Sequence, residues 1–78
     1  MAPVTIYTTP FCGFCSAAKS LLRQKGIAFT EIDVASDKAR HAEMLGRANG
    51  RRTVPQIFIG STHVGGYDDL RALDVAGR

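Results

Sequence analysis

Residues 4–15 read VTIYTTPFCGFC, and this stretch decides the fold of the chain. An apolar run typical of a strand stops at Pro10, and a helical pattern begins at Gly13. Cys12 therefore stands at the start of a predicted helix, and Cys15 lies nearly one turn inside it. The unpaired N–H groups and the positive dipole end of a helix stabilise a thiolate at this position. The placement predicts redox chemistry, with Cys12 as the nucleophile and Cys15 as the resolving thiol.

The rest of the sequence alternates between strand and helix patterns. We predict strands at about 3–8, 27–34, 54–59 and 63–65, and helices at 13–25, from a cap at Ser36 or Asp37 to about Ala48, and from a cap at Asp68 or Asp69 through Val75. Apolar residues on both faces of 27–34 predict a strand that is covered on each side. A right-handed crossover makes the first two strands parallel, and the short turn after residue 59 makes the last two antiparallel. The order βαβαββα predicts an α/β, thioredoxin-like fold, in which three helices flank a four-stranded mixed sheet.

Length and composition narrow the functional class. With 78 residues, 45% of them hydrophobic and 22% charged, we expect a single globular domain over residues 1–78. No apolar run approaches the roughly 18 residues of a membrane-spanning helix. The sequence has no basic stripe interleaved with aromatic residues, which argues against nucleic-acid binding. The beginning of the chain does not resemble a secretion signal, so we expect a cytoplasmic protein.

The net charge of +3 is small. The basic residues are scattered along the chain, apart from a cluster formed by Arg47, Arg51 and Arg52. These arginines fit a solvated loop before a strand. They also fit a rim that attracts an anionic ligand.

Two cysteines separated by two residues also occur in zinc sites. A tetrahedral zinc site needs four ligands, and only His41 and His63 remain to complete one. Their spacing matches no common zinc motif, so we favour a redox pair over a zinc half-site or two inert core cysteines.

The tripeptide Thr53-Val54-Pro55 is a second candidate element. The proline fits a simple position at the edge of a sheet. A cis Val54–Pro55 bond is the more functional interpretation. It would turn the backbone of Val54 toward the sulfurs, where an extended thiol peptide could pair with it as an added strand.

The segment GGYDD at residues 65–69 is a third candidate element of the functional site. Its glycines fit an ordinary turn, or a close approach of the backbone to a ligand. In the second case the N–H groups of Tyr67 and Asp68 would meet a carboxylate, and the Asp68 side chain would receive an ammonium group. A zwitterionic amino-acid head satisfies both demands.

Together, CGFC at 12–15, TVP at 53–55 and GGYDDL at 65–70 resemble the glutaredoxin family, and specifically its small bacterial dithiol members. The resemblance covers almost the whole chain. It implies a glutathione-dependent thiol–disulfide oxidoreductase, with glutathione as co-substrate, that reduces glutathione mixed disulfides and protein disulfides. In addition to the catalytic Cys12 and Cys15, it implies a glutathione site formed by Phe14, Thr53, Val54, Pro55, Gly66, Tyr67 and Asp68.

The sequence departs from many relatives at two places. Gly13-Phe14 replaces the common Pro-Tyr pair, and Thr9 replaces a lysine that helps to bind the glycyl carboxylate of glutathione. Arg40, His41 and Arg51 are the candidates to replace that lysine.

Two further functions stay open. By resemblance, glutaredoxins with glycine after the first cysteine can hold a [2Fe–2S] cluster between two subunits, with Cys12 of each subunit and two glutathiones as ligands. We therefore expect a monomer, or a dimer if a cluster binds, and no other metal site. The other alternative is an electron donor for ribonucleotide reductase that is itself reduced by thioredoxin reductase. Such a protein would need no site for the γ-glutamyl head of glutathione, and Gly66, Tyr67 and Asp68 argue against it.

Overall fold

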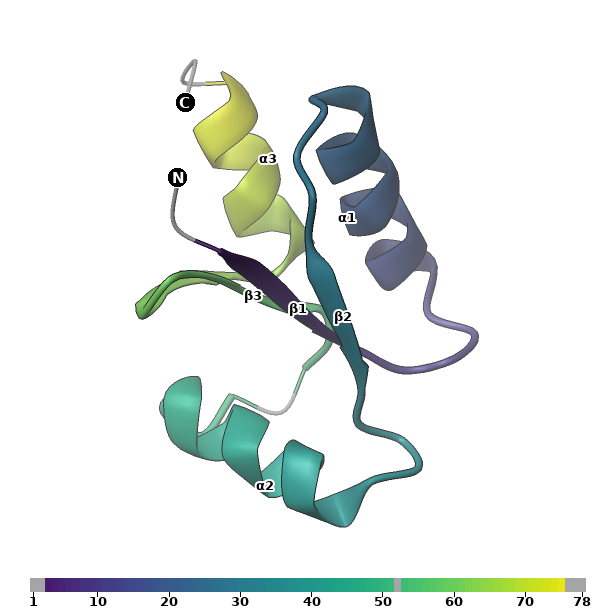
Figure 1. Cartoon of the computed structure of the whole chain (residues 1–78), viewed down its shortest axis with the longest axis vertical. Helices are drawn as coiled ribbons and strands as arrows, with labels where there is room; N and C mark the ends of the chain where they lie inside the picture. Colours follow the sequence, from purple (N-terminus) through teal and green to yellow (C-terminus); the bar gives the residue numbers. More distant parts are fainter. Residues whose placement is uncertain (1–2, 52, 76–78) are drawn as a thin grey trace.

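The computed structural model describes residues 3–51 and 53–75 and shows a mixed sheet between helices (Figure 1). The elements are β1 (Val4–Thr8), α1 (Gly13–Gln24), β2 (Thr30–Asp33), α2 (Lys38–Arg47), β3 (Gln56–Ile59), β4 (Thr62–Gly65) and α3 (Tyr67–Val75). The strand order is β2-β1-β3-β4. β1 is parallel to β2 and antiparallel to β3, and β3 is antiparallel to β4. The predicted α/β thioredoxin-like fold, with four strands and three helices, is confirmed.

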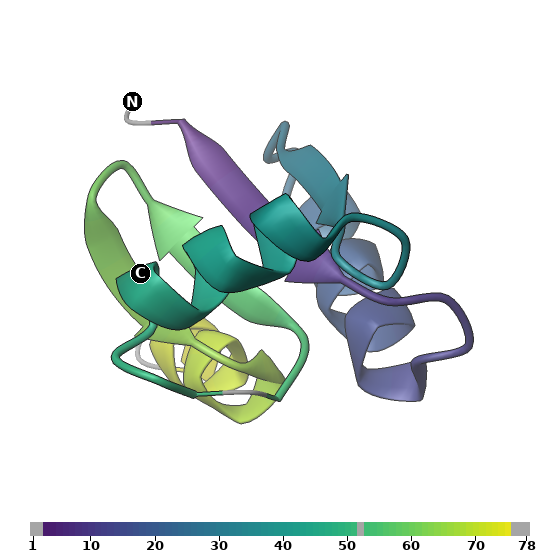
Figure 2. The same ribbon diagram turned by 90° about the horizontal axis from the view of Figure 1, so that it is seen from below.

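The two faces of the sheet are covered by different helices. α1 and α3 lie side by side on one face, and α2 crosses the other (Figures 1 and 2). Because neighbouring residues of a strand point to opposite faces, each central strand contributes to both cores. Ile6 and Ile57 pack with α1 and α3, whereas Tyr7 and Phe58 pack with α2. None of the described helices is long and apolar enough to cross a membrane.

Helix boundaries follow local capping. Cys12 caps α1, and its sulfur accepts a hydrogen bond from the backbone N–H of Cys15. Of the two predicted caps for α2, the structure selects Asp37, whose carboxylate accepts a hydrogen bond from the backbone N–H of Arg40 at 3.1 Å. Both arrangements satisfy N–H groups that have no partner within the helix.

Three predicted features of the strands are wrong: the start of β2, its cover on both faces, and the start of β3. β2 begins at Thr30 instead of residue 27, and it is an edge strand that pairs only with β1. Its side chains are mostly exposed, with Ile32 half-buried, so the expected cover on both sides is absent. β3 begins at Gln56 instead of Val54, because residues 53–55 belong to the loop before it.

The start of α3 also differs from the prediction. The helix begins at Tyr67, so Asp68 and Asp69 lie in its first turn and neither is the capping residue. Asp69 reaches back instead, and its carboxylate accepts a hydrogen bond from the backbone N–H of Gly66 at 2.9 Å. This is the carboxylate half of a capping box, which needs an acidic residue three positions after the cap.

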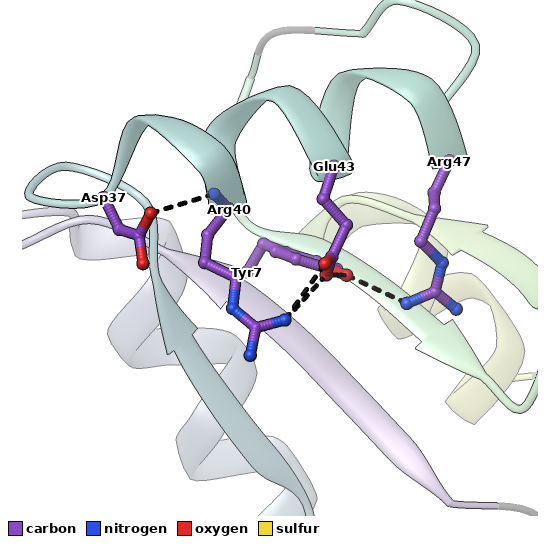
Figure 3. A network of polar contacts seen from close by, with 5 residues as sticks. All are labelled: Tyr7, Asp37, Arg40, Glu43 and Arg47. Atoms are coloured by element: carbon purple, nitrogen blue, oxygen red, sulfur yellow. Dashed lines mark hydrogen bonds and ion pairs between the residues drawn. The ribbon is translucent and has the colours of Figure 1, made fainter.

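A polar network attaches α2 to the sheet (Figure 3). The buried Tyr7 hydroxyl donates to the carboxylate of Glu43 and accepts a hydrogen bond from Arg47 at 2.9 Å. Burial and the bond to Glu43 raise the pKa of Tyr7. The guanidinium of Arg47 also lies 4.1 Å from the ring centroid of Phe58. Arg47 therefore belongs to the packing of α2.

Candidate active site

Cys12 lies where β1, α1 and the loop before β3 meet. Its sulfur accepts the hydrogen bond from the Cys15 backbone N–H at 3.2 Å. Its thiol lies 3.8 Å from the carbonyl oxygen of Val54, to which it donates. The side chain is half-buried, so an incoming disulfide can reach the sulfur. The N–H donor and the helix dipole stabilise negative charge on this atom, which is what a nucleophilic thiolate requires.

Cys15 has the opposite environment. It is 2% exposed and packs inside the first turn of α1. Burial, followed by the contact with Cys12, raises the pKa of the Cys15 thiol to about 12. The two sulfurs of the motif are therefore inequivalent. The Cys12 sulfur is accessible and accepts a backbone N–H, whereas the Cys15 thiol is shielded and protonated at neutral pH.

A groove of about 310 Å³ opens beside Cys12. Its walls are formed by Phe14, Arg51, Thr53, Val54, Pro55, Gly66, Tyr67, Asp68 and Asp69. The structure thus brings together all seven residues for which the family resemblance implies glutathione binding, and adds Arg51 and Asp69. The rings of Phe14 and Tyr67, whose centroids are 6.1 Å apart, face the groove from α1 and α3.

One wall of the groove is the loop at residues 53–55. The Val54–Pro55 peptide bond is cis, which was one of the two alternatives from the sequence. The fully buried side chain of Gln56 holds this loop, since its amide donates to the backbone carbonyl of Thr53 at 2.8 Å. His63 in turn lies 2.7 Å from the amide oxygen of Gln56. Sequence reasoning missed this support, and a glutamine in an otherwise apolar strand was the signal for it.

The opposite wall is the turn into α3. A Cβ atom on Gly65 would lie 2.7 Å from Cγ of Asp69 and 3.0 Å from a guanidinium nitrogen of Arg51. Gly65 also has φ +119°, a region that disfavours side chains. Because residue 65 has no side chain, it leaves room for the ion pair between Arg51 and Asp69, whose charged atoms are 3.5 Å apart.

The predicted arginine cluster is divided by the fold. Arg51 lines the groove, whereas Arg47 packs against the sheet beneath α2. Arg52 lies outside the described residues. Arg40, a candidate to replace the lysine missing at Thr9, pairs with Glu43 at 3.0 Å on α2. Only Arg51 brings a positive charge to the groove from the residues that the structure describes.

A second hollow, of about 270 Å³, lies on the other side of Cys12. Its lining residues are Thr8, Thr9, Pro10, Phe11, Cys12, Cys15, Ser16, Lys19, Glu31 and Asp33. Glu31 accepts hydrogen bonds from Lys19 at 2.9 Å and from Thr8 at 2.8 Å, and these bonds lower its pKa. The hollow was not predicted from the sequence, because it forms only where Glu31 and Asp33 of β2 lie beside residues 8–19.

Neither histidine joins the cysteines. His63 is engaged with Gln56 and stacks on Phe58, with ring centroids 4.8 Å apart. His41 lies on α2. Across residues 3–51 and 53–75, no three His, Cys, Asp or Glu side chains gather as metal ligands.

Comparison with known proteins places this geometry in a family. The family model described as Glutaredoxin matches residues 4–64. The chain belongs to the glutaredoxin family. A glutaredoxin from Pseudomonas aeruginosa is 54% identical over 78 residues, which are all of this chain and 92% of the relative. Membership makes this glutaredoxin a thiol–disulfide oxidoreductase.

Solved glutaredoxin structures share the fold. The solution structure of a glutaredoxin from Brucella melitensis is 55% identical, with a TM-score of 0.84 over 99% of this chain and 83% of the other. The crystal structure of a buckwheat glutaredoxin–glutathione complex is 33% identical, with a TM-score of 0.86 over 97% of this chain and 71% of the other.

Proposed function

We propose that this glutaredoxin uses glutathione to reduce glutathione mixed disulfides and protein disulfides. The observation that carries the proposal is the groove beside Cys12. One end is at the Val54 carbonyl, 3.8 Å from the nucleophilic sulfur, and the groove extends to the start of α3. A bound thiol peptide would therefore have its sulfur at Cys12 and its amino-acid head at a helix N-terminus. A related buckwheat glutaredoxin is known in complex with glutathione, which supports this choice of ligand.

The chemistry of the walls suits each part of glutathione. The backbone of Val54 pairs with the cysteinyl unit as an added strand would. At the start of α3, the N–H groups of Tyr67 and Asp68 have no partner within the helix and are suited to bind an anion, so we assign them to the γ-glutamyl carboxylate. The Asp68 carboxylate receives the adjacent ammonium. Arg51 lies close to Gly66 and Asp69, so we assign it to the γ-glutamyl carboxylate instead of the glycyl one.

The reaction is two successive thiol–disulfide exchanges. The Cys12 thiolate attacks the glutathione sulfur of a mixed disulfide, a Cys12–glutathione bond forms, and the substrate thiolate leaves and takes up a proton. A second glutathione thiolate then attacks the bound glutathione sulfur, which releases glutathione disulfide and restores the Cys12 thiolate. With a protein disulfide, Cys15 attacks Cys12 instead, and the Cys12–Cys15 disulfide forms as the substrate thiol departs. The mixed-disulfide cycle consumes one glutathione, because the other half of the glutathione disulfide comes from the substrate. After a protein disulfide, two glutathiones reduce the Cys12–Cys15 disulfide and leave as glutathione disulfide.

The partners follow from this cycle: glutathione, and proteins that carry glutathionylated cysteines or disulfides. The cycle needs a pool of reduced glutathione, so we place the protein in the cytoplasm. We also propose that residues 1–78 work as a single domain and as a monomer.

A coupled assay tests the function. The protein is supplied with cysteine–glutathione mixed disulfide, glutathione, glutathione reductase and NADPH, and NADPH oxidation is followed. We expect saturable turnover there, and none when thioredoxin reductase replaces glutathione and its reductase. Turnover with thioredoxin reductase alone would instead support the electron donor that needs no glutathione site.

Assembly of a [2Fe–2S] cluster is a second candidate, and Gly13 favours it. A Cβ atom at Gly13 would meet nothing within 4 Å, so the surface next to Cys12 is open to a second subunit. The ligands would be Cys12 of each subunit and two glutathiones. Anaerobic reconstitution with iron, sulfide and glutathione, followed by gel filtration, should give a coloured dimer. Gly13→Pro is the matched variant and should reduce the yield of cluster, and a colourless monomer from the unaltered protein would eliminate this candidate.

A further inference from the structure

Phe11 is the most exposed large apolar side chain among the described residues. It is fully exposed, and the other large apolar side chain on the surface, Phe14, is 64% exposed. Phe14 has a place in the glutathione groove, but Phe11 does not line it. Phe11 also has φ +61°, in the left-handed region that aromatic residues rarely occupy. Neither the packing nor the backbone therefore explains an aromatic residue at this position.

Phe11 borders the second hollow, on the side of Cys12 that the glutathione groove leaves free. The hollow holds the carboxylates of Glu31 and Asp33 against the single ammonium of Lys19. Lys19 and Glu31 are paired with each other. Asp33 is exposed, and one of its carboxylate oxygens accepts the backbone N–H of Ala35 at 2.7 Å. One negative charge thus remains uncompensated beside an exposed aromatic ring.

We propose that Phe11 and this hollow dock the polypeptide of an oxidised protein substrate. The segment that fits is extended, with an apolar side chain next to its reactive cysteine to cover Phe11 and a basic side chain to meet Asp33. The inference rests on the proposed function, because it assigns the groove at Phe14 to glutathione and the opposite side of Cys12 to the protein. It adds no chemical step. It adds selectivity among disulfides that all react with the same sulfur.

The test uses short peptides of equal length, each with one glutathionylated cysteine. Leu or Ser precedes the cysteine and Lys or Glu follows it, which gives four substrates. For the unaltered protein we expect kcat/KM to be highest for the Leu/Lys peptide and lowest for the Ser/Glu peptide. Cysteine–glutathione mixed disulfide, which has no flanking residues, serves as the reference substrate.

Two substitutions separate the contributions. Phe11→Asn removes the ring, and asparagine tolerates the left-handed backbone. It should reduce the Leu/Ser preference at least fivefold, whereas Phe11→Leu should retain most of it. Asp33→Asn keeps an acceptor for Ala35 and removes the charge. It should reduce the Lys/Glu preference about threefold, an effect that high salt should mimic in the unaltered protein.

If the Leu/Ser preference were the same in the unaltered protein and in Phe11→Asn, the proposed docking surface would be wrong. Ratios of kcat/KM within each variant cancel any general loss of active protein. If the unaltered protein turned over neither the peptides nor the reference substrate, the proposed function itself would fail. Turnover of the reference with no peptide preference would reject the docking surface alone.

Discussion

The backbone N–H of Cys15 donates to the sulfur of Cys12 at 3.2 Å, so the proposed resolving residue supports the proposed nucleophile through its main chain. The side chain of the same residue is buried, and burial keeps its thiol protonated. The helix that begins at Gly13 thus gives its two cysteines different tasks. We propose that Cys12 attacks first, and that Cys15 attacks only after its buried thiol loses a proton.

Replacing each cysteine should separate the two branches of the cycle. Cys15→Ser keeps the Cys12 sulfur and the backbone N–H beside it, so it should retain reduction of cysteine–glutathione mixed disulfide and lose most reduction of protein disulfides. Cys12→Ser should lose both activities, by about a hundredfold or more, because the one remaining cysteine, Cys15, is buried. The glutathione reductase coupled assay and insulin disulfide reduction measure the two branches. Turnover of the mixed disulfide by Cys12→Ser would show that the roles are wrongly assigned.

The step that we propose for Cys15, its attack on the Cys12–glutathione bond, should become faster as the pH rises. Because burial raises the pKa of Cys15 to about 12, only a small fraction is thiolate near neutrality. That fraction grows about tenfold per pH unit below the pKa, and the thiolate is the attacking form. Stopped-flow release of glutathione from the Cys12–glutathione adduct, between about pH 6 and pH 9, measures this rate. The Cys15→Ser adduct is the control and should be stable, and a flat profile for the unaltered protein would contradict the expectation.

Loss of the charge at Arg51 should weaken glutathione binding. Arg51→Gln is expected to raise KM for glutathione substrates about fivefold, as for loss of a partly exposed charge contact worth about 1 kcal/mol. The effect should shrink at high salt because exposed charges are screened. Arg71→Gln is the matched control: it removes the same charge from an exposed position of α3 that does not line the groove. Equal KM changes in the two variants would refute a specific role for Arg51.

Two glycines should respond oppositely to alanine. Gly65→Ala would place a methyl group against Asp69 at a positive φ, so we expect a loss of about 1–3 kcal/mol in the free energy of unfolding and weaker glutathione binding. Gly46→Ala lies within α2, where nothing stands within 4 Å of the added carbon, and it should stabilise the protein by about 0.5–1 kcal/mol. Urea unfolding compares them. A tolerated alanine at residue 65 would mean that the turn into α3 can rearrange.

The polar network of Tyr7, Glu43 and Arg47 beneath α2 should make the free energy of unfolding fall at acid pH. The hydrogen bond from Tyr7 holds the pKa of Glu43 below the ordinary value of 4.5. This contact therefore stabilises the fold above that value and is lost as the pH falls through the lowered pKa. Tyr7→Phe should cost about 1 kcal/mol in the free energy of unfolding at pH 7, where it removes a buried hydroxyl that makes two hydrogen bonds.

The difference between Tyr7→Phe and the unaltered protein should become smaller from pH 7 to an acid pH below the lowered pKa of Glu43, because Glu43 is then protonated in both. Urea unfolding at the two pH values measures this change. The free energy of unfolding of Glu43→Gln should also change less between the two pH values than that of the unaltered protein, because glutamine does not titrate. A difference that grew toward low pH would mean that Glu43 does not carry the coupling.

The sequence by itself determined the order of the elements and the place of the cysteines. These depend on neighbours in the chain: apolar periodicity, a proline that stops a strand, and a capping atom three residues from its donor. Seven of the nine groove residues were named because they belong to short motifs that resemble those of glutaredoxins.

Tertiary structure decided what depends on contacts between distant segments. Arg51 lines the groove and Arg47 packs beneath α2, although they lie only four residues apart in the sequence. Tertiary structure also put β2 at the edge of the sheet, selected the cis form before Pro55, and placed Gln56 behind that loop. A side chain's partner across the fold is set by how whole elements pack, and the pattern of residues along one segment does not contain that information.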